Sequence, residues 1–254
     1  MLKKRIIFTL LYKDEYFCLS RNFRLQNVGK LEWIKKNYDF SIITKSIDEL
    51  IILNISKEKN SEKKFCKTLE ILSKECFIPI SAGGKINNIE IAKKYVNSGA
   101  DKLVINSSLI NEYLLKEIAE IFGNQCLVAS IDYTRNKNNY NFFTNSGKYQ
   151  YQIKVSDLFK KLLMLPVGEI LLNSIDKDGT GSGYDFKILN KIPENFFKPI
   201  IFSGGAGNYK HLLEALKKKK IDSVSTSNLL NFLGNGLEEA RILIKKSGIK
   251  LAEW

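Results

Sequence analysis

Short apolar runs alternate with amphipathic stretches along the whole chain. The runs are nearly continuous in apolar residues, as is typical of parallel strands buried on both faces. They predict strands at 5–10, 50–55, 77–81, 102–105, 126–131, 169–173, 199–203 and 222–226. Between them, apolar residues at helical spacing predict helices that include 63–72, 89–96, 110–121, 155–163, 209–216 and 237–246.

Eight strands that alternate with helices predict parallel βα units. The chain has 254 residues, which fits a single closed (β/α)₈ TIM barrel of about 250 residues. A doubly wound open sheet is the alternative. The run 80–84 (ISAGG) returns as 202–205 (FSGG), and this favours a barrel made of two half-barrel repeats. We find no linker between the halves and expect one domain over residues 1–254.

One long segment interrupts the alternation. Residues 133–152 are rich in Asn, Tyr and Thr and follow the fifth predicted strand. The Asn145–Lys148 stretch (NSGK) is typical of a turn. We expect an inserted β-hairpin over the top of the barrel.

Composition excludes several classes of protein. There is one histidine, and the four cysteines lack CxxC spacing, so we expect no metal site, no cofactor and no disulfide scaffold. No apolar run reaches the roughly 20 residues that cross a bilayer, and we recognise no signal peptide. We therefore expect a cytoplasmic protein with reduced thiols that does not bind membranes.

The net charge of +13 admits two explanations. A strongly basic chain is typical of nucleic-acid binding. However, the lysines are spread over predicted helix surfaces, which is the pattern of a Lys-, Asn- and Ile-rich composition. We expect no nucleic-acid partner and a preference for anionic, phosphorylated small molecules.

Glycine-rich turns at the carboxyl ends of the strands are candidate phosphate cradles. Such turns let backbone N–H groups approach an anion, and a helix N-terminus adds partial positive charge. Gly204 and Gly205 follow the seventh strand, and Ser227 and Asn228 follow the eighth. The equivalent positions of the first half are Gly84, Lys85, Asn106 and Ser107. The pattern favours a ligand with two anionic ends, with ordinary tight turns as the alternative.

The loop after the sixth strand combines carboxylates, hydroxyls and glycines. It reads Asn173–Asp185 (NSIDKDGTGSGYD). A calcium loop is an alternative, but the flanking helices and terminal Glu of an EF-hand are missing.

This loop makes the chain resemble the HisF family, the cyclase subunits of imidazole glycerol phosphate synthase. The similarity extends to residues 3–7 (KKRII), 99–102 (GADK), 131–132 (ID) and 203–207 (SGGAG) and covers nearly the whole chain. It implies a ribulose-phosphate-binding type barrel that docks a HisH-type glutaminase on its N-terminal face. Ammonia then travels through the barrel to a bisphosphate substrate.

The resemblance also implies roles for individual residues. A charged gate at the barrel base would consist of Arg5, Glu49, Lys102 and Glu169, with Asp101 at the glutaminase interface. A structural ion-pair layer is the alternative for the gate. Asp132 would be catalytic, and Asp178 and Gly179 would join the phosphate-binding residues.

The chain departs from the family pattern in its first half. The catalytic Asp expected on strand one is Leu11, the Lys of the first loop is Leu19, the carboxylate of strand two is Asn54, and a glycine is Lys85. Since leucine cannot transfer a proton, the acid–base pair lacks one partner. Lys85 could instead supply a point charge to phosphate.

Three hypotheses follow. The first is a WbuZ-like, glycosyl amidation-associated HisF protein that delivers ammonia to a separate sugar amidotransferase. The second is a working cyclase subunit of histidine biosynthesis, in which Asp176 or Asp178 assists Asp132. The third is a scaffold that only activates a glutaminase. Isomerase chemistry of the related HisA barrel is less favoured, because it also needs the Asp replaced by Leu11.

Overall fold

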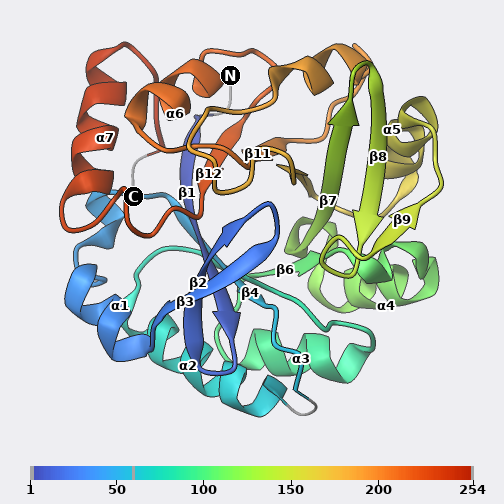
Figure 1. The fold of residues 1–254 in the computed structure, drawn as a ribbon. Coiled ribbons are helices and arrows are strands. Elements are labelled where there is room, and N and C mark those ends of the chain that lie inside the picture. Colours follow the sequence, from blue (N-terminus) through green and yellow to red (C-terminus); the bar gives the residue numbers. More distant parts are fainter. Residues whose placement is uncertain (1–2, 59–60, 253–254) are drawn as a thin grey trace.

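The strands close into a barrel. The structure, a computed structural model, describes residues 3–58 and 61–252. Within these residues eight parallel strands pair in the order β1-β4-β5-β6-β7-β10-β11-β12, and β12 returns to β1 (Figure 1). Their bounds are Arg5–Lys13, Glu49–Asn54, Ile80–Gly83, Lys102–Ile105, Leu127–Asn136, Glu169–Ser174, Ile200–Ser203 and Ser223–Thr226. The predicted (β/α)₈ barrel is confirmed, and the open sheet is wrong.

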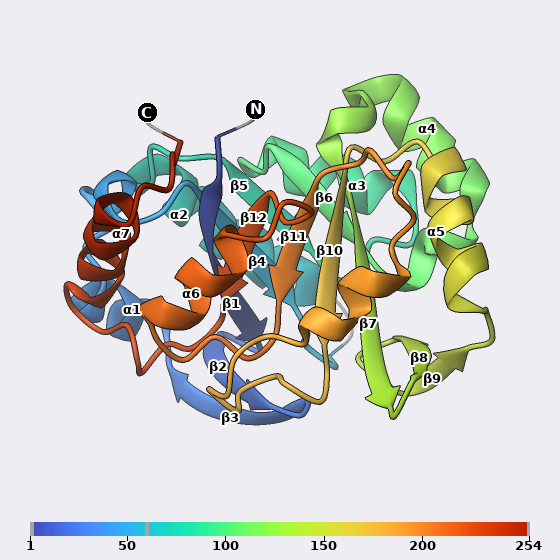
Figure 2. The same cartoon turned by 90° about the horizontal axis from the view of Figure 1, so that it is seen from above.

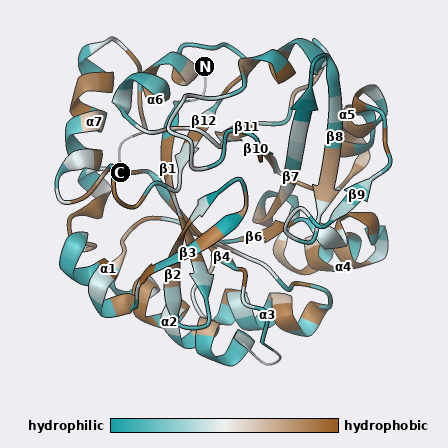
Figure 3. Cartoon of the chain, in the orientation of Figure 1, coloured by the Kyte–Doolittle hydropathy of each residue, from teal (hydrophilic) through white to brown (hydrophobic). Residues whose placement is uncertain are grey.

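Helices surround the strands. They are α1 (Leu31–Asn37), α2 (Ser61–Glu75), α3 (Ile89–Asn97), α4 (Glu112–Phe122), α5 (Val155–Met164), α6 (Tyr209–Leu216) and α7 (Gly236–Lys246). Figure 3 shows hydrophobic and hydrophilic stretches in the same helices, as expected where one face packs on a barrel. None of the helices in the described residues is long and apolar enough to span a membrane.

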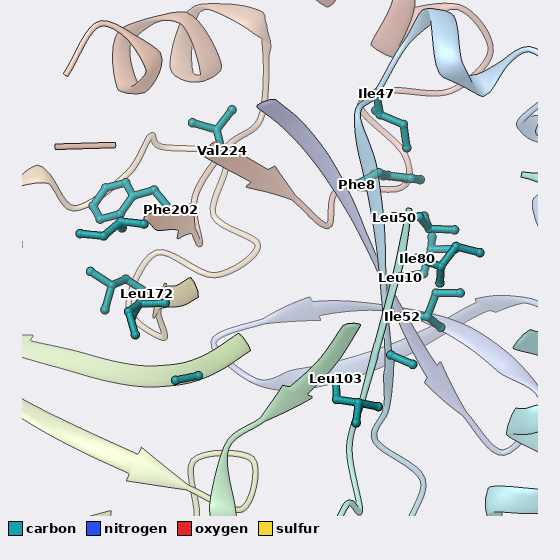
Figure 4. Close-up of a cluster of buried hydrophobic side chains, with 14 of the residues drawn as sticks. Phe8, Leu10, Ile47, Leu50, Ile52, Ile80, Leu103, Leu172, Phe202 and Val224 are labelled. Atoms are coloured by element: carbon teal, nitrogen blue, oxygen red, sulfur yellow. The ribbon is translucent and has the colours of Figure 1, made fainter. Parts of the chain in front are cut away.

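The main hydrophobic core lies between the strands and these helices. Successive strand residues point to opposite faces of a sheet, so Ile6, Phe8 and Leu10 of β1 all point outward into this core. Figure 4 shows part of the cluster, including Phe8 and Leu50. The odd-numbered residues of β1 are therefore left for the barrel interior.

Two antiparallel additions lie at one end of the barrel, opposite the end where β1 begins (Figure 2). Strands β2 (Tyr16–Arg21) and β3 (Arg24–Gly29) form a hairpin on β1. Strands β8 (Asn139–Thr144) and β9 (Tyr149–Tyr151) extend β7 antiparallel, with a turn at 145–148. The β2–β3 hairpin lies in the first loop, for which the sequence pattern predicts no strand.

Some predicted boundaries shift. The strand predicted at 77–81 begins at Ile80, and Phe77 is 76% exposed. Pro79 has no N–H to donate to a ladder, so the regular strand starts after it. The sixth βα unit carries a 3₁₀ helix, Phe186–Lys191, instead of an α-helix. Shorter 3₁₀ turns lie at Ile43–Lys45, Ser107–Ile110 and Asn124–Cys126.

Candidate functional site

Side chains inside the barrel lie in layers from base to mouth. A separate apolar cluster fills the middle and consists of Ile7, Ile51, Val104, Val128, Leu171 and Ile201. Because side chains two apart on a strand share a face, the residues two before this layer lie at the base and those two or four after it lie at the mouth. The base set is Arg5, Glu49, Lys102 and Glu169, and the mouth set includes Leu11, Asn106, Asp132 and Asn173.

The four base residues form a closed ring of ion pairs. Arg5 donates to Glu49 at 2.8 Å and to Glu169 at 2.7 Å. Lys102 lies 2.8 Å from Glu49 and 3.3 Å from Glu169. The Ser81 hydroxyl donates to the second oxygen of Glu49 at 2.6 Å. Each cation thus bridges both carboxylates, and the ring is neutral overall.

The partly buried charges of the ring are all paired. Glu49 is 1% exposed, and an unpaired buried charge would be costly. Burial alone would lower the pKa of Arg5, but Glu169 and Glu49 outweigh it and raise that pKa. The structure therefore brings together all four residues of the predicted gate, and it does so as a salt-bridged layer across the barrel floor.

Asp132 lies at the mouth of the barrel on β7. It is 7% exposed, and two neighbouring strands hold its carboxylate. Asn173 Nδ2 donates to one oxygen at 2.9 Å, and Asn106 Nδ2 donates to the other at 3.2 Å. Burial raises the pKa of Asp132 to about 7, with Asn173 opposing the change and Asp178 adding to it. A carboxyl group with such a pKa can take up and release a proton near neutral pH.

Opposite Asp132, strand β1 offers no carboxylate. Leu11 pairs with Leu53 of β4, so this side of the mouth is aliphatic. Asn54 is 2% exposed and turns to Ser61 and the Tyr95 hydroxyl. Asn54 is therefore part of the packing behind the mouth.

The loop after β10 holds the β2–β3 hairpin. The Asp178 carboxylate accepts hydrogen bonds from the Ser20 hydroxyl and from the Phe23 N–H, and the Asp178 carbonyl accepts one from Asn22 N. A Cβ at Gly179 would lie 1.9 Å from the Ser20 carbonyl oxygen, so only glycine allows this approach. Burial raises the pKa of Asp178, while Ser20 and Phe23 oppose the rise.

Asp176, the other carboxylate of this loop, is engaged elsewhere. It accepts a hydrogen bond from Arg135 N at 2.6 Å. Of the two carboxylates that could assist Asp132, only Asp178 influences the pKa of Asp132.

The candidate phosphate cradle of the second half-barrel, made by the turns after β11 and β12, lines a cavity of about 260 Å³. We call it the second-half cradle. The cavity lies between the β2–β3 hairpin and the loops after β10, β11 and β12. Four predicted phosphate-binding residues border it together with Asp178 and Gly179, namely Gly204, Gly205, Ser227 and Asn228. Gly204 and Gly205 have φ of +90° and +112°, and a Cβ at either would strike backbone oxygens at 2.5 and 2.2 Å. Six predicted residues thus meet at one cavity.

The first-half cradle is occupied by contacts within the protein. A Cβ at Gly84 would lie 2.0 Å from the Asn54 carbonyl oxygen. Lys85 donates to the Glu58 carbonyl and lies 4.0 Å from the Glu62 carboxylate. Ser107 Oγ accepts from Asn145 N at 3.0 Å, and Asn106 contacts Asp132, as described above. This half therefore offers fewer free donors than the second half.

The base surface around the ring carries exposed apolar side chains. Phe77, Met164 and Phe197 are 76%, 86% and 77% exposed. They lie in the segments just before β5, β10 and β11, which enter the barrel at the ring. Asp101, the predicted interface residue, is exposed in the same layer and also accepts the Ile80 N–H at 2.8 Å.

The sequence pattern did not single out three residues of the mouth. Asn173 pairs in register with Asp132, so strand alignment could have identified it. Arg21 and Arg24 border the 260 Å³ cavity, but their hairpin was not predicted. Within the described residues, no cluster of His, Cys, Asp or Glu could hold a metal ion.

Comparison with known proteins agrees with this geometry. Residues 39–232 match a family described as histidine biosynthesis protein. A protein named imidazole glycerol phosphate synthase subunit hisF2, from Parasynechococcus marenigrum, is 44% identical over all of this chain and 95% of its own length. Subunits named HisF from Pelodictyon phaeoclathratiforme and Bacillus pumilus are 36% and 32% identical. These matches cover 98% and 99% of this chain and 98% and 100% of the relatives.

Proposed function

The chain belongs to the HisF family, and we propose that it is the ammonia-using subunit of an imidazole glycerol phosphate synthase type complex. The observation that carries the proposal is the position of Asp132. Its carboxyl group, with a pKa of about 7, lies at the mouth, four residues along β7 from Val128 of the apolar layer. In this proposal the barrel has a proton-transfer group at one end and, at the other end, a layer of ion pairs with no net charge.

The base is the docking face for a HisH-type glutaminase in this proposal. Phe77, Met164 and Phe197 give this face the exposed apolar area that a protein partner would cover. The ring of Arg5, Glu49, Lys102 and Glu169 is the gate. Ammonia is small and neutral, so it can pass an apolar layer that excludes ammonium and other ions.

At the mouth, the substrate is a phosphorylated small molecule. The cavity bordered by Gly204, Gly205 and Asn228 holds one phosphate. Asp132 moves the proton as ammonia attacks, and Asp178, on the loop after β10, is the second acid–base group in the role that Leu11 cannot fill. No resident metal or cofactor takes part in the proposed reaction.

The direct test is cyclase turnover. The purified chain is given the bisphosphate substrate of the cyclase reaction and an ammonium salt. We expect slow turnover that Asp132→Asn abolishes and Asp157→Asn, an exposed control on α5, leaves unchanged. Since general acid–base help is worth roughly 10²–10⁴-fold, Leu11→Asp should accelerate the reaction. Growth of a histidine auxotroph is the cellular form of the test.

Leu11 favours a second candidate function. An aliphatic residue in place of the strand-one carboxylate suits a protein that transfers ammonia to a separate sugar amidotransferase for glycan amidation. That role predicts stimulation of the glutaminase without turnover of the bisphosphate. This combination of results would refute the cyclase proposal.

A further inference from the structure

Two arginines of the β2–β3 hairpin face the cavity of the second-half cradle. Arg21 and Arg24 are directly opposite each other across the hairpin, next to its turn. Leu19 and Gln26, one pair further along the same face, also line the cavity. Since residues of one hairpin face alternate with those of the other, this face as a whole is turned to the cradle.

The arginine pair lacks a partner inside the protein. Directly opposed like charges destabilise an antiparallel pair of strands. Both residues are exposed, and within residues 3–58 and 61–252 neither guanidinium group has a hydrogen bond or ion pair. The neighbouring pair is different, because Ser20 contacts Asp178. The hairpin thus holds two uncompensated cations at the rim of a cavity.

The charges around the cavity favour an anion. Its charged lining residues are Arg21, Arg24 and Asp178, with a net charge of +1. The Asp178 carboxylate already accepts hydrogen bonds from Ser20 and Phe23, which hold the hairpin over the opening. Across the cavity, Gly204 and Gly205 present backbone with positive φ, a conformation that can point N–H groups at an anion.

We propose that Arg21 and Arg24 form the second side of a phosphate-monoester site, gripping the dianion against the loops after β11 and β12. Arginine suits this position because its planar fork binds two phosphate oxygens at once. The inference deepens the proposed function, on which it rests for the substrate, by naming the cations that select a doubly charged end group. A bound dianion would also relieve the repulsion between the two arginines.

The test measures binding of inorganic phosphate by calorimetry at constant ionic strength, without substrate or glutaminase. For Arg21→Gln/Arg24→Gln we expect at least about tenfold weaker binding, since each charged hydrogen bond contributes substantially. Arg21→Lys/Arg24→Lys should be intermediate, because lysine keeps the charge and loses the fork. The control Lys63→Gln/Lys67→Gln removes two exposed cations of α2 and should bind phosphate as the wild type does.

A further variant tests whether the anion binds between the hairpin and the loop after β12. Asn228→Asp keeps the oxygen that accepts the Asn231 N–H and adds a negative charge to the opposite side of the cavity, so it should also weaken phosphate binding. The melting temperature of the double glutamine variant should not fall, because the repulsive pair is gone.

Several results would overturn the inference: equal affinity of the wild type and the double glutamine variant, equal loss in the α2 control, unchanged binding in Asn228→Asp, or no phosphate binding by the wild type. Stimulation of a glutaminase through the base does not involve the hairpin. Both this stimulation and the cyclase turnover of the wild type would persist if only this inference failed, whereas cyclase turnover would be missing if the proposed function failed.

Discussion

Asp132→Asn should stabilise the protein at neutral and alkaline pH while removing the proposed proton-transfer group. The pKa of Asp132 rises from its ordinary value of 3.8 to about 7 on folding. Between these values the folded state holds a proton that the unfolded state has released, so stability falls as pH rises through this window. Asparagine is neutral throughout and does not carry this cost.

The magnitude follows from linkage. One pKa unit corresponds to about 1.36 kcal/mol, so the carboxylate costs up to about 4 kcal/mol at pH 8. In Asp132→Asn, the new amide NH₂ group faces one of the two donors, Asn106 or Asn173. The hydrogen bond to that donor is lost, which lowers the stability by about 1 kcal/mol. A net gain of about 3 kcal/mol therefore remains at pH 8.

Urea unfolding of the wild type and Asp132→Asn between pH 5 and pH 8 measures this difference. The advantage of the variant should grow by about 2.5 kcal/mol over this range, a change that does not depend on the lost hydrogen bond. Asp157→Asn controls for the loss of one negative charge. If the advantage is constant with pH, or if the variant is less stable at pH 8, Asp132 is not a buried carboxyl group with a raised pKa.

Three further predictions concern the base, the hairpin and the partner surface. Glu49→Gln leaves the ring with one carboxylate for two cations and should lower the free energy of unfolding, measured with urea, by about 2–4 kcal/mol. Glu169→Gln should lower it by less, because Glu169 is more exposed. Equal losses in the two variants would contradict the burial argument. Gly179→Ala brings a Cβ to 1.9 Å from the Ser20 carbonyl oxygen and should release the hairpin from the loop after β10. Proteolysis between β2 and β3 should then be faster, and an unchanged rate of proteolysis would contradict the close contact between Gly179 and Ser20. Phe77→Ser should leave the melting temperature unchanged and weaken glutaminase binding at least about tenfold, as expected for a central apolar contact; full-strength binding would place the partner elsewhere.

Much of the barrel was predictable because its signals are local. Buried parallel strands are short apolar runs, and alternation along them assigns each residue to the inside or the outside of the barrel. The glycines after β11 could be predicted from their place at a strand end, whereas a role for Asp132 was predicted only from the resemblance to the HisF family. The β2–β3 hairpin was not predicted, since Arg24–Gly29 is mostly polar and exposed and has no apolar run.

The barrel, the family and the candidate residues at both ends follow from the amino-acid sequence. Which of these residues lie together depends on the folded chain. Arg5 and Glu169 are 164 positions apart and form one ring, and Ser20 and Asp178 are 158 apart and hold the hairpin closed. Such contacts depend on how the closed sheet aligns distant strand ends, and so do the burial that raises the pKa of Asp132 and the placement of Arg21 over the cavity.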